Sequence, residues 1–145
     1  MKVTVSQKSE VIKQGQEIRY QVFTLEQSIP TELDLDGLDN QSFHALVTEH
    51  NSPIATARLT VHEDCSATMA RVAVDKAYRG KGIASKVVSA LQQHAKSIGV
   101  SSIEIHAHEY LRAYYEKLGF EFIEEVEVVG EHQLIAMEQK LLVTE

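Results

Sequence analysis

The chain has 145 residues, of which 43% are hydrophobic and only two are proline, and its formal net charge is −7. This composition is typical of a chain that folds around a substantial core, and we expect one domain over residues 1–145. The acidic balance argues against a nucleic-acid partner, because binding to phosphates needs a basic face.

Cysteine content and hydropathy indicate the compartment. The single cysteine, Cys65, cannot form an internal disulfide, and no set of Cys and His residues has the spacing of a zinc site, so we expect no metal. The N-terminal stretch MKVTVSQKSEVIKQGQ lacks the apolar run of a secretory signal. No segment approaches the length of a transmembrane helix. We therefore expect a cytoplasmic protein without a membrane partner.

The first half of the chain predicts a strand, a long helix and three further strands. Residues 2–5 alternate in polarity like a strand. Apolar residues spaced by three and four then run from Val11 to Leu25, as in an amphipathic helix, which Pro30 ends. Residues 31–40 are acidic and rich in turn formers, so they predict an exposed, solvated loop. Three strands are then predicted, at about 42–48, 54–61 and 68–74.

In the second half, the hydrophobic period changes at Gly82, where a helix is predicted to begin. Gly99 stands where that helix is expected to end. Alternation over 102–107 predicts another strand, and a short helix at about 110–118 stops at Gly119. Two final strands, near 121–128 and 133–142, flank the predicted turn VGEH. The order β-α-β-β-β-α-β-α-β-β predicts one mixed α/β (α+β) architecture.

The junction RGKG, residues 79–82, joins a predicted strand to a predicted helix. Backbone N–H groups in the first turn of a helix have no partner within the helix, and the helix dipole adds partial positive charge there. Gly80 and Gly82 let an oxygen ligand approach the backbone, and Arg79 and Lys81 add two cations. The junction therefore predicts a phosphate or pyrophosphate site. A plain solvated loop is the competing interpretation.

Known phosphate motifs do not identify the ligand. A P-loop needs a glycine where Asp75 stands and a serine or threonine directly after Lys81. The dinucleotide fingerprint needs a third glycine where Ser85 stands. Spacing alone therefore leaves a pyrophosphate-like ligand unidentified.

Two segments resemble the GNAT superfamily of N-acetyltransferases. Residues 79–84 match its R/Q-x-x-G-x-G/A motif, and residues 107–120 are similar to its A-x-x-F/Y-Y-x-x-x-G-F segment. The predicted order of elements also matches that family. The resemblance implies a central, mostly antiparallel sheet of about seven strands flanked by helices.

The same resemblance implies acetyl-CoA as co-substrate, no metal, and transfer of the acetyl group to a primary amine of a small molecule or peptide by direct attack. In that family the strand before the motif pairs with the pantetheine arm and the motif holds the pyrophosphate. Carried over to this sequence, these positions are Val72, Ala73 and Val74 for the arm and Arg79, Gly80, Lys81, Gly82, Ile83, Ala84 and Ser85 for the pyrophosphate. A non-catalytic acyl-CoA-binding module is the alternative function.

Tyr115 occupies the tyrosine position of the second motif, which implies a general acid that protonates the departing thiolate. Tyr114 is the alternative if the register differs by one residue, and a packed aromatic is the alternative without chemistry. His106 and His108 could relay a proton from the amine, but we favour ordinary surface positions for both. A homodimer through an edge strand is common among GNAT folds and is expected here.

A third resemblance, over residues 18–47, is to ElaA-like GNAT proteins. The matching positions are Arg19, Val22, Phe23, Glu26, Gln27, Pro30, Asp36, Asp39 and His44. From this resemblance we expect Glu26 and His44 to line the amine pocket, against the alternatives of helix surface and a buried strand residue. That branch usually has a Pro-His-x-x-Met run, whereas here His132 stands two residues early relative to Met137.

Overall fold

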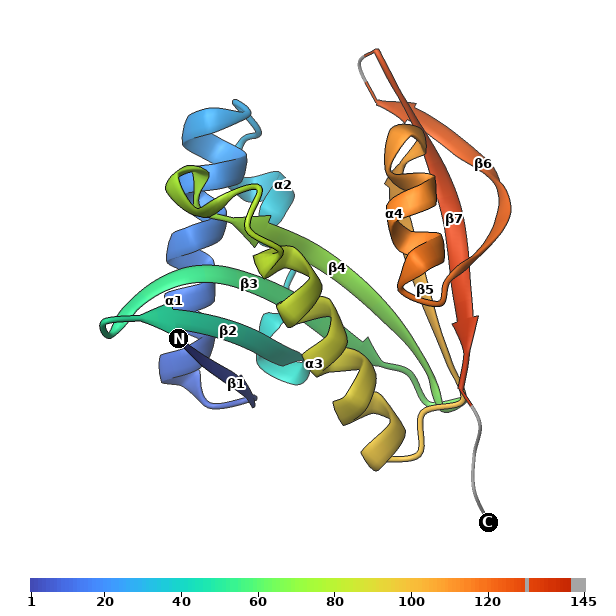
Figure 1. Cartoon of the computed structure of the whole chain (residues 1–145), viewed down its shortest axis with the longest axis horizontal. Helices are drawn as coiled ribbons and strands as arrows, with labels where there is room; N and C mark the ends of the chain where they lie inside the picture. Colours follow the sequence, from blue (N-terminus) through green and yellow to red (C-terminus); the bar gives the residue numbers. More distant parts are fainter. Residues whose placement is uncertain (130, 142–145) are drawn as a thin grey trace.

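A computed structural model describes residues 1–129 and 131–141 (Figure 1). Within them, seven strands form one sheet in the order β1-β2-β3-β4-β5-β7-β6, and only the β4–β5 pair is parallel. The predicted order of elements and the mostly antiparallel sheet are thus confirmed. The strands are β1 (Lys2–Ser6), β2 (Phe43–Glu49), β3 (Ser52–Val61), β4 (Ser66–Val74), β5 (Ser102–His108), β6 (Glu121–Val129) and β7 (His132–Lys140).

Helices cover both faces of the sheet. The helices are α1 (Ser9–Arg19), α2 (Thr31–Asp34), α3 (Ile83–Ser97) and α4 (Arg112–Lys117). Strand residues alternate between the faces, so Ala45 packs in the cluster under α3 and α4 while Leu46 packs under α1. The predicted long first helix is α-helical only over α1. From there it continues as a π-helical segment, Tyr20–Glu26.

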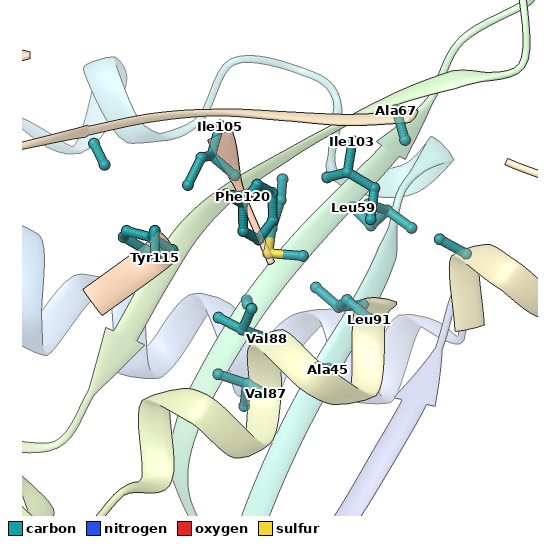
Figure 2. Packing of buried hydrophobic residues seen from close by; sticks show 14 of the residues in the cluster. Ala45, Leu59, Ala67, Val87, Val88, Leu91, Ile103, Ile105, Tyr115 and Phe120 are labelled. Carbon is teal, nitrogen blue, oxygen red and sulfur yellow. The ribbon is translucent and has the colours of Figure 1, made fainter. Parts of the chain in front are cut away.

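The larger core lies between the sheet and the face of α3 and α4 (Figure 2). Val87, Val88 and Leu91 of α3 are fully buried there, in agreement with the 3.6-residue period of the sequence. Gly99 follows the helix with a φ of +83°, a left-handed conformation that ends a helix and that glycine adopts without strain.

The parallel pair of β4 and β5 separates along its length. Ser66 pairs with Ser102 and Met69 pairs with Ile105, but no later pair of these two strands is formed among the described residues. Figure 1 shows the two strands close at one end and apart at the other. Residues 70–74 of β4 and 106–108 of β5 therefore border an opening in the sheet.

Residues 31–40 differ from the prediction of an exposed, solvated loop. They contain α2 and a short 3₁₀ turn, and Asp34 and Asp39 are each only 6% exposed. The physical reason is three arginines on neighbouring elements, which satisfy these carboxylates where water cannot. The last predicted strand ends at Lys140, and its predicted end at residue 142 and Gly130 of the predicted VGEH turn lie outside the described residues.

Candidate active site

The glycine-bearing junction forms an open turn at the start of α3. Gly80 and Gly82 have φ of +78° and +74°, and a Cβ atom added to either would meet no atom within 4 Å. Gly82 is the N-cap of the 15-residue helix α3, and no side chain caps the free N–H groups. The turn thus presents backbone donors, a helix dipole and open space at one point, which is the arrangement that binds anions.

The side chains on either side of Gly82 divide between core and turn. Ile83 is 2% exposed and points into the core, so it offers only its backbone to a ligand. Ala84 is half-buried. The Ser85 hydroxyl shares a 2.8 Å hydrogen bond with the hydroxyl of Tyr114 on α4. Lys81 is exposed, and its Nζ lies 5.5 Å from the centre of the Tyr78 ring.

Arg79 is held by a carboxylate in this structure. Its Nη2 donates to Glu26 Oε1 at 2.7 Å, its Nη1 donates to the other oxygen, and its Nε donates to the carbonyl of Val74 at 3.0 Å. The hydrogen bonds from Arg79 lower the pKa of Glu26 below its ordinary value, so the carboxylate is ionised at neutral pH. Arg79 was expected to bind the pyrophosphate and Glu26 to line the amine pocket, but in this structure the two side chains bind each other.

A β-bulge interrupts β4 beside the opening. Thr56 pairs with Ala73 and Arg58 pairs with Ala70, so two residues of β4, Arg71 and Val72, oppose the single residue Ala57. Arg71 has a φ of +59°, which is strained for a residue with a side chain. The bulge turns the backbone of Val72, Ala73 and Val74 relative to the regular ladder, on the edge that β5 leaves free.

Tyr115 lies in the core cluster at 7% exposure, while its neighbour Tyr114 reaches α3 through Ser85. The Tyr115 ring packs edge-on against Tyr114, with centroids 5.2 Å apart. It packs in the same way against Phe120, with centroids 5.9 Å apart (Figure 2). Burial, with a smaller contribution from Tyr114, raises the pKa of Tyr115 to about 12. Its hydroxyl therefore keeps its proton at neutral pH, as a general acid must before it reacts.

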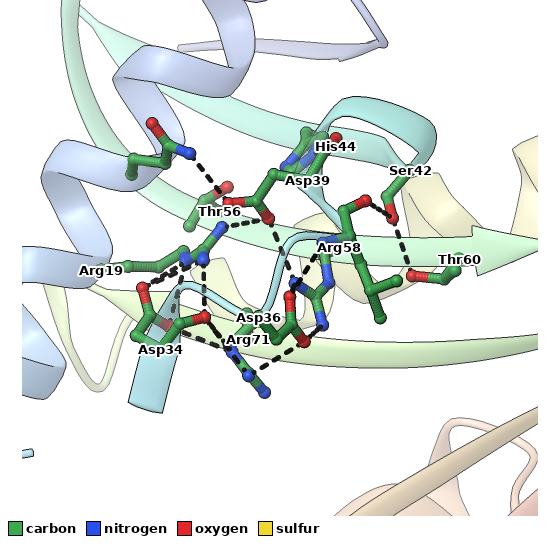
Figure 3. A network of polar contacts seen from close by, with 12 residues as sticks. Arg19, Asp34, Asp36, Asp39, Ser42, His44, Thr56, Arg58, Thr60 and Arg71 are labelled. Atoms are coloured by element: carbon green, nitrogen blue, oxygen red, sulfur yellow. Dashed lines mark hydrogen bonds and ion pairs between the residues drawn. The ribbon is translucent and has the colours of Figure 1, made fainter. Parts of the chain in front are cut away.

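Three arginines and three aspartates form a polar network behind the bulge (Figure 3). It joins α1, the segment 31–40, β3 and β4 through Arg19, Asp34, Asp36, Asp39, Arg58 and Arg71. Arg19 and Arg58 are 1% and 3% exposed and would be costly to bury without partners. Equal numbers of opposite charges and 2.8–3.3 Å contacts make their burial possible.

Asp39 is the centre of this network. Burial opposes its ionisation, but hydrogen bonds from Arg19 and Gln16 and the positive charge of Arg19 hold its pKa well below the usual range. Arg19 Nη1 and Arg58 Nη1 share its Oδ1 at 2.8 and 3.1 Å. The two strand arginines, Arg58 and Arg71, are both ion-paired, with Asp36 and Asp34 respectively. Asp34 was missed as a partner, because its neighbours in sequence suggest a solvated loop.

His44 is buried at 1% exposure beside the network, and its Nε2 lies 2.9 Å from the backbone oxygen of Asp39. Burial, ahead of the opposing influence of Asp39, lowers its pKa, so the ring is neutral at neutral pH. A side chain this buried supports the loop that holds Asp39 rather than facing solvent. Its role in binding the acceptor stays a prediction.

The other two candidate histidines lie in β5 and differ from each other. His106 is exposed, and its Nε2 lies 3.5 Å from Glu104 on the same strand. His108, the last residue of β5, is half-buried beside a hollow of about 280 Å³. The hollow is lined by His108, Glu109, Tyr110, Glu131, His132 and Gln133.

In residues 1–129 and 131–141, no helix is both long and apolar enough to cross a membrane. The same described residues contain no group of three or more His, Cys, Asp or Glu side chains arranged to hold a metal ion.

An open turn at a helix start, suited to binding an anion, thus lies near a bulged strand and an opening in the sheet. The family model "Acetyltransferase (GNAT) domain" matches residues 8–141. The chain therefore belongs to the GNAT family of acetyltransferases and is an enzyme, as the resemblance implied, rather than a non-catalytic module.

Individual relatives agree with this assignment. The chain is 28% identical over 127 residues to the uncharacterized N-acetyltransferase YjcF of Bacillus subtilis, covering 88% of this chain and 90% of YjcF. The crystal structure of Escherichia coli ElaA superposes with a TM-score of 0.85 at 21% identity, over 96% of this chain and 99% of ElaA. An aminoglycoside 6'-N-acetyltransferase complexed with coenzyme A superposes with a TM-score of 0.80 at 11% identity, over 100% and 99% of the two chains.

Proposed function

We propose that this enzyme transfers the acetyl group of acetyl-CoA to a primary amine by direct attack. The observation that carries the proposal is the open turn at Gly80 and Gly82, with uncapped N–H groups at the start of α3. The coenzyme A complex of a protein with the same fold supports the choice of ligand.

The residues assigned by resemblance fit this ligand. Backbone N–H groups of residues 80–85 bind pyrophosphate oxygens, and Arg79 and Lys81 neutralise their charge. The free edge of Val72, Ala73 and Val74 pairs with the amides of the pantetheine arm like an added strand. Bound acetyl-CoA supplies the activated acyl group as a thioester.

Catalysis depends mainly on orientation and on stabilising developing charge. A backbone N–H near Val72, in the bulge, polarises the thioester carbonyl in this proposal. Tyr115 holds the proton that the departing thiolate takes up. Glu26 and His44 are proposed on the acceptor side, where Glu26 becomes free to hold an ammonium group once Arg79 turns to the pyrophosphate.

Calorimetric titration with CoA and dephospho-CoA tests the proposal. The Gly82→Ala variant should bind either ligand at least about tenfold more weakly, because its Cβ occupies the space the pyrophosphate needs. Gly99→Ala is the matched control: it also places a Cβ at a positive φ, and also meets no atom within 4 Å. The two substitutions should lower the melting temperature similarly.

Loss of CoA binding in both variants would mean that strain, not the site, is responsible. Absence of any binding by the unaltered protein at millimolar ligand would overturn the proposal. A thiol-release assay with acetyl-CoA against a panel of diamines, amino sugars, amino acids and peptides then identifies the acceptor.

A further inference from the structure

The hollow at the end of β5 contains a second group suited to proton transfer. β7 pairs with β5 up to the cross-strand pair of His108 and Leu134. His132 lies two residues before Leu134 in β7 and therefore on the same face of the sheet as His108. Such diagonal neighbours are within reach of aromatic rings. The His108 and His132 ring centroids are 4.9 Å apart, edge to face, and the Tyr110 ring stacks on His108 at 5.2 Å.

His108 stands at the opening where β4 and β5 separate. Pairing between these strands stops at Ile105, so residues 106–108 have β7 on one side and, among described residues, no strand on the other. The edge of β4 proposed for the pantetheine arm and the end of β5 that carries His108 thus border the same opening.

The Nδ1 atom of the His108 ring is buried and lacks a hydrogen-bond partner among the described residues. Among those residues, His44 Nδ1 and His94 Nε2 are also buried without a partner, but His108 lines a hollow, where a ligand or water can complete its hydrogen bonding. His106 differs, because it is exposed and lies next to Glu104.

The surroundings keep His108 neutral and attract a cation. Burial, and then the positive charge that His132 can carry, lower the pKa of His108, so its ring is ready to accept a proton at neutral pH. The other titratable groups of the hollow are Glu109, Tyr110 and Glu131, and no lysine or arginine lines it. The two exposed carboxylates favour entry of an ammonium group.

We infer that His108 is the general base of this enzyme and that the hollow it shares with His132 admits the reacting amine, while Glu26 and His44 contact the rest of the acceptor. The inference rests on the proposed function. The incoming ammonium loses one proton to a ring nitrogen of His108, and the free amine then forms the N–C bond to the thioester carbonyl carbon. The C–S bond breaks, the electron pair leaves with sulfur, and Tyr115 protonates the thiolate. The positively charged nitrogen of the adduct loses its second proton to water, and water returns a proton to the Tyr115 oxygen.

The test compares His108→Gln with the matched control His106→Gln, two residues away on the same strand. The unaltered enzyme should show a kcat/KM that rises with pH as His108 loses its proton. His108→Gln should lose this dependence and fall about a hundredfold or more. His106→Gln should keep both the profile and the rate. An unchanged profile in His108→Gln, or an equal loss in His106→Gln, overturns the inference.

A second readout needs no turnover. Ring resonances of His108 can be assigned by their absence in His108→Gln. In the unaltered protein they should show a pKa below the ordinary value of histidine, and His132→Gln should raise that pKa. The His108 resonances should also shift when 1,3-diaminopropane is added to the CoA-saturated protein. CoA binding without a response of His108 to any amine of the panel overturns the inference and leaves the cofactor assignment standing. Absence of CoA binding overturns the proposed function, and the inference with it.

Discussion

Glu26 and Arg79 form a pair that acetyl-CoA has to separate if Arg79 binds the pyrophosphate. Both side chains are more than 30% exposed, so the pair is partly screened by solvent. Glu26→Gln removes the competing charge, and we expect CoA affinity to rise roughly two- to fivefold. Glu32→Gln, an exposed carboxylate in α2, is the control and should leave affinity unchanged. Calorimetry measures both, and weaker CoA binding in Glu26→Gln would contradict the competition.

The two neighbouring tyrosines of α4 have separable roles. Tyr115→Phe keeps the buried ring and removes only the proton, so turnover should fall about a hundredfold or more with little change in stability. Tyr114→Phe loses its hydrogen bond to Ser85, which costs about 1 kcal/mol of stability, and turnover should change less than tenfold. Steady-state kinetics and urea unfolding distinguish them. A larger rate loss in Tyr114→Phe would reassign the general acid.

At the scale of elements, the bulge in β4 is held in place from behind. Arg71 adopts its strained φ while its guanidinium binds Asp34 at 3.0 Å and Asp36 at 3.3 Å. The network therefore connects α1 and the segment 31–40 to the strand edge proposed for acetyl-CoA. A left-handed φ costs a non-glycine residue about 1–2 kcal/mol, which these contacts offset.

Two substitutions at Arg71 separate strain from contacts. Both Arg71→Ala and Arg71→Gly lose the guanidinium, but only glycine adopts the positive φ freely. The greater freedom of glycine in the unfolded state costs about 0.4–1 kcal/mol, less than the strain relieved. We therefore expect Arg71→Gly to be the more stable by roughly 1 kcal/mol in urea unfolding.

Ala70 provides the control for this comparison, because it lies in the same strand and its φ is not positive. There, alanine should be more stable than glycine by about 0.5–1 kcal/mol. If Arg71→Gly were no more stable than Arg71→Ala, the strain at the bulge would be absent.

For the whole molecule, the network predicts how stability depends on pH. The pKa of Asp39 is lower in the folded protein than in the unfolded chain. The pKa of Asp36 is lowered in the same way by its hydrogen bond from Arg58. Their contribution is therefore complete above about pH 4 and is lost as pH falls through the folded values. The lowered pKa of His44 adds a loss that begins below about pH 6.5.

Melting temperatures between pH 8 and pH 2.5 measure this dependence. We expect a plateau near neutrality, a small decline below about pH 6.5 and a steep one below about pH 4. Asp36→Asn should be less stable at pH 7 and should lose less on acidification, since one of the titrating carboxylates is gone. A variant that lost as much as the unaltered protein would show that Asp36 does not contribute.

The sequence by itself determined the order of elements and the glycine turn. Hydrophobic period distinguishes the helix after Gly82 from the strands around it, and a glycine pair between strand and helix predicts an open turn. These signals are local, since they depend on neighbours three or four residues apart. The same local reasoning assigned residues 31–40 to an exposed loop, because nothing nearby in the sequence indicates the arginines that bury Asp34 and Asp39.

Only the tertiary structure decided which distant residues meet. Arg19, Arg58 and Arg71 come from three separate elements, and their convergence on the segment 31–40 depends on sheet order and on the bulge in β4. His106 and His108 are alike in sequence, yet pairing with β7 places His108 beside His132 and leaves His106 exposed. Strand register and burial set these differences, and neither can be read from residue spacing, because both depend on which strands become neighbours.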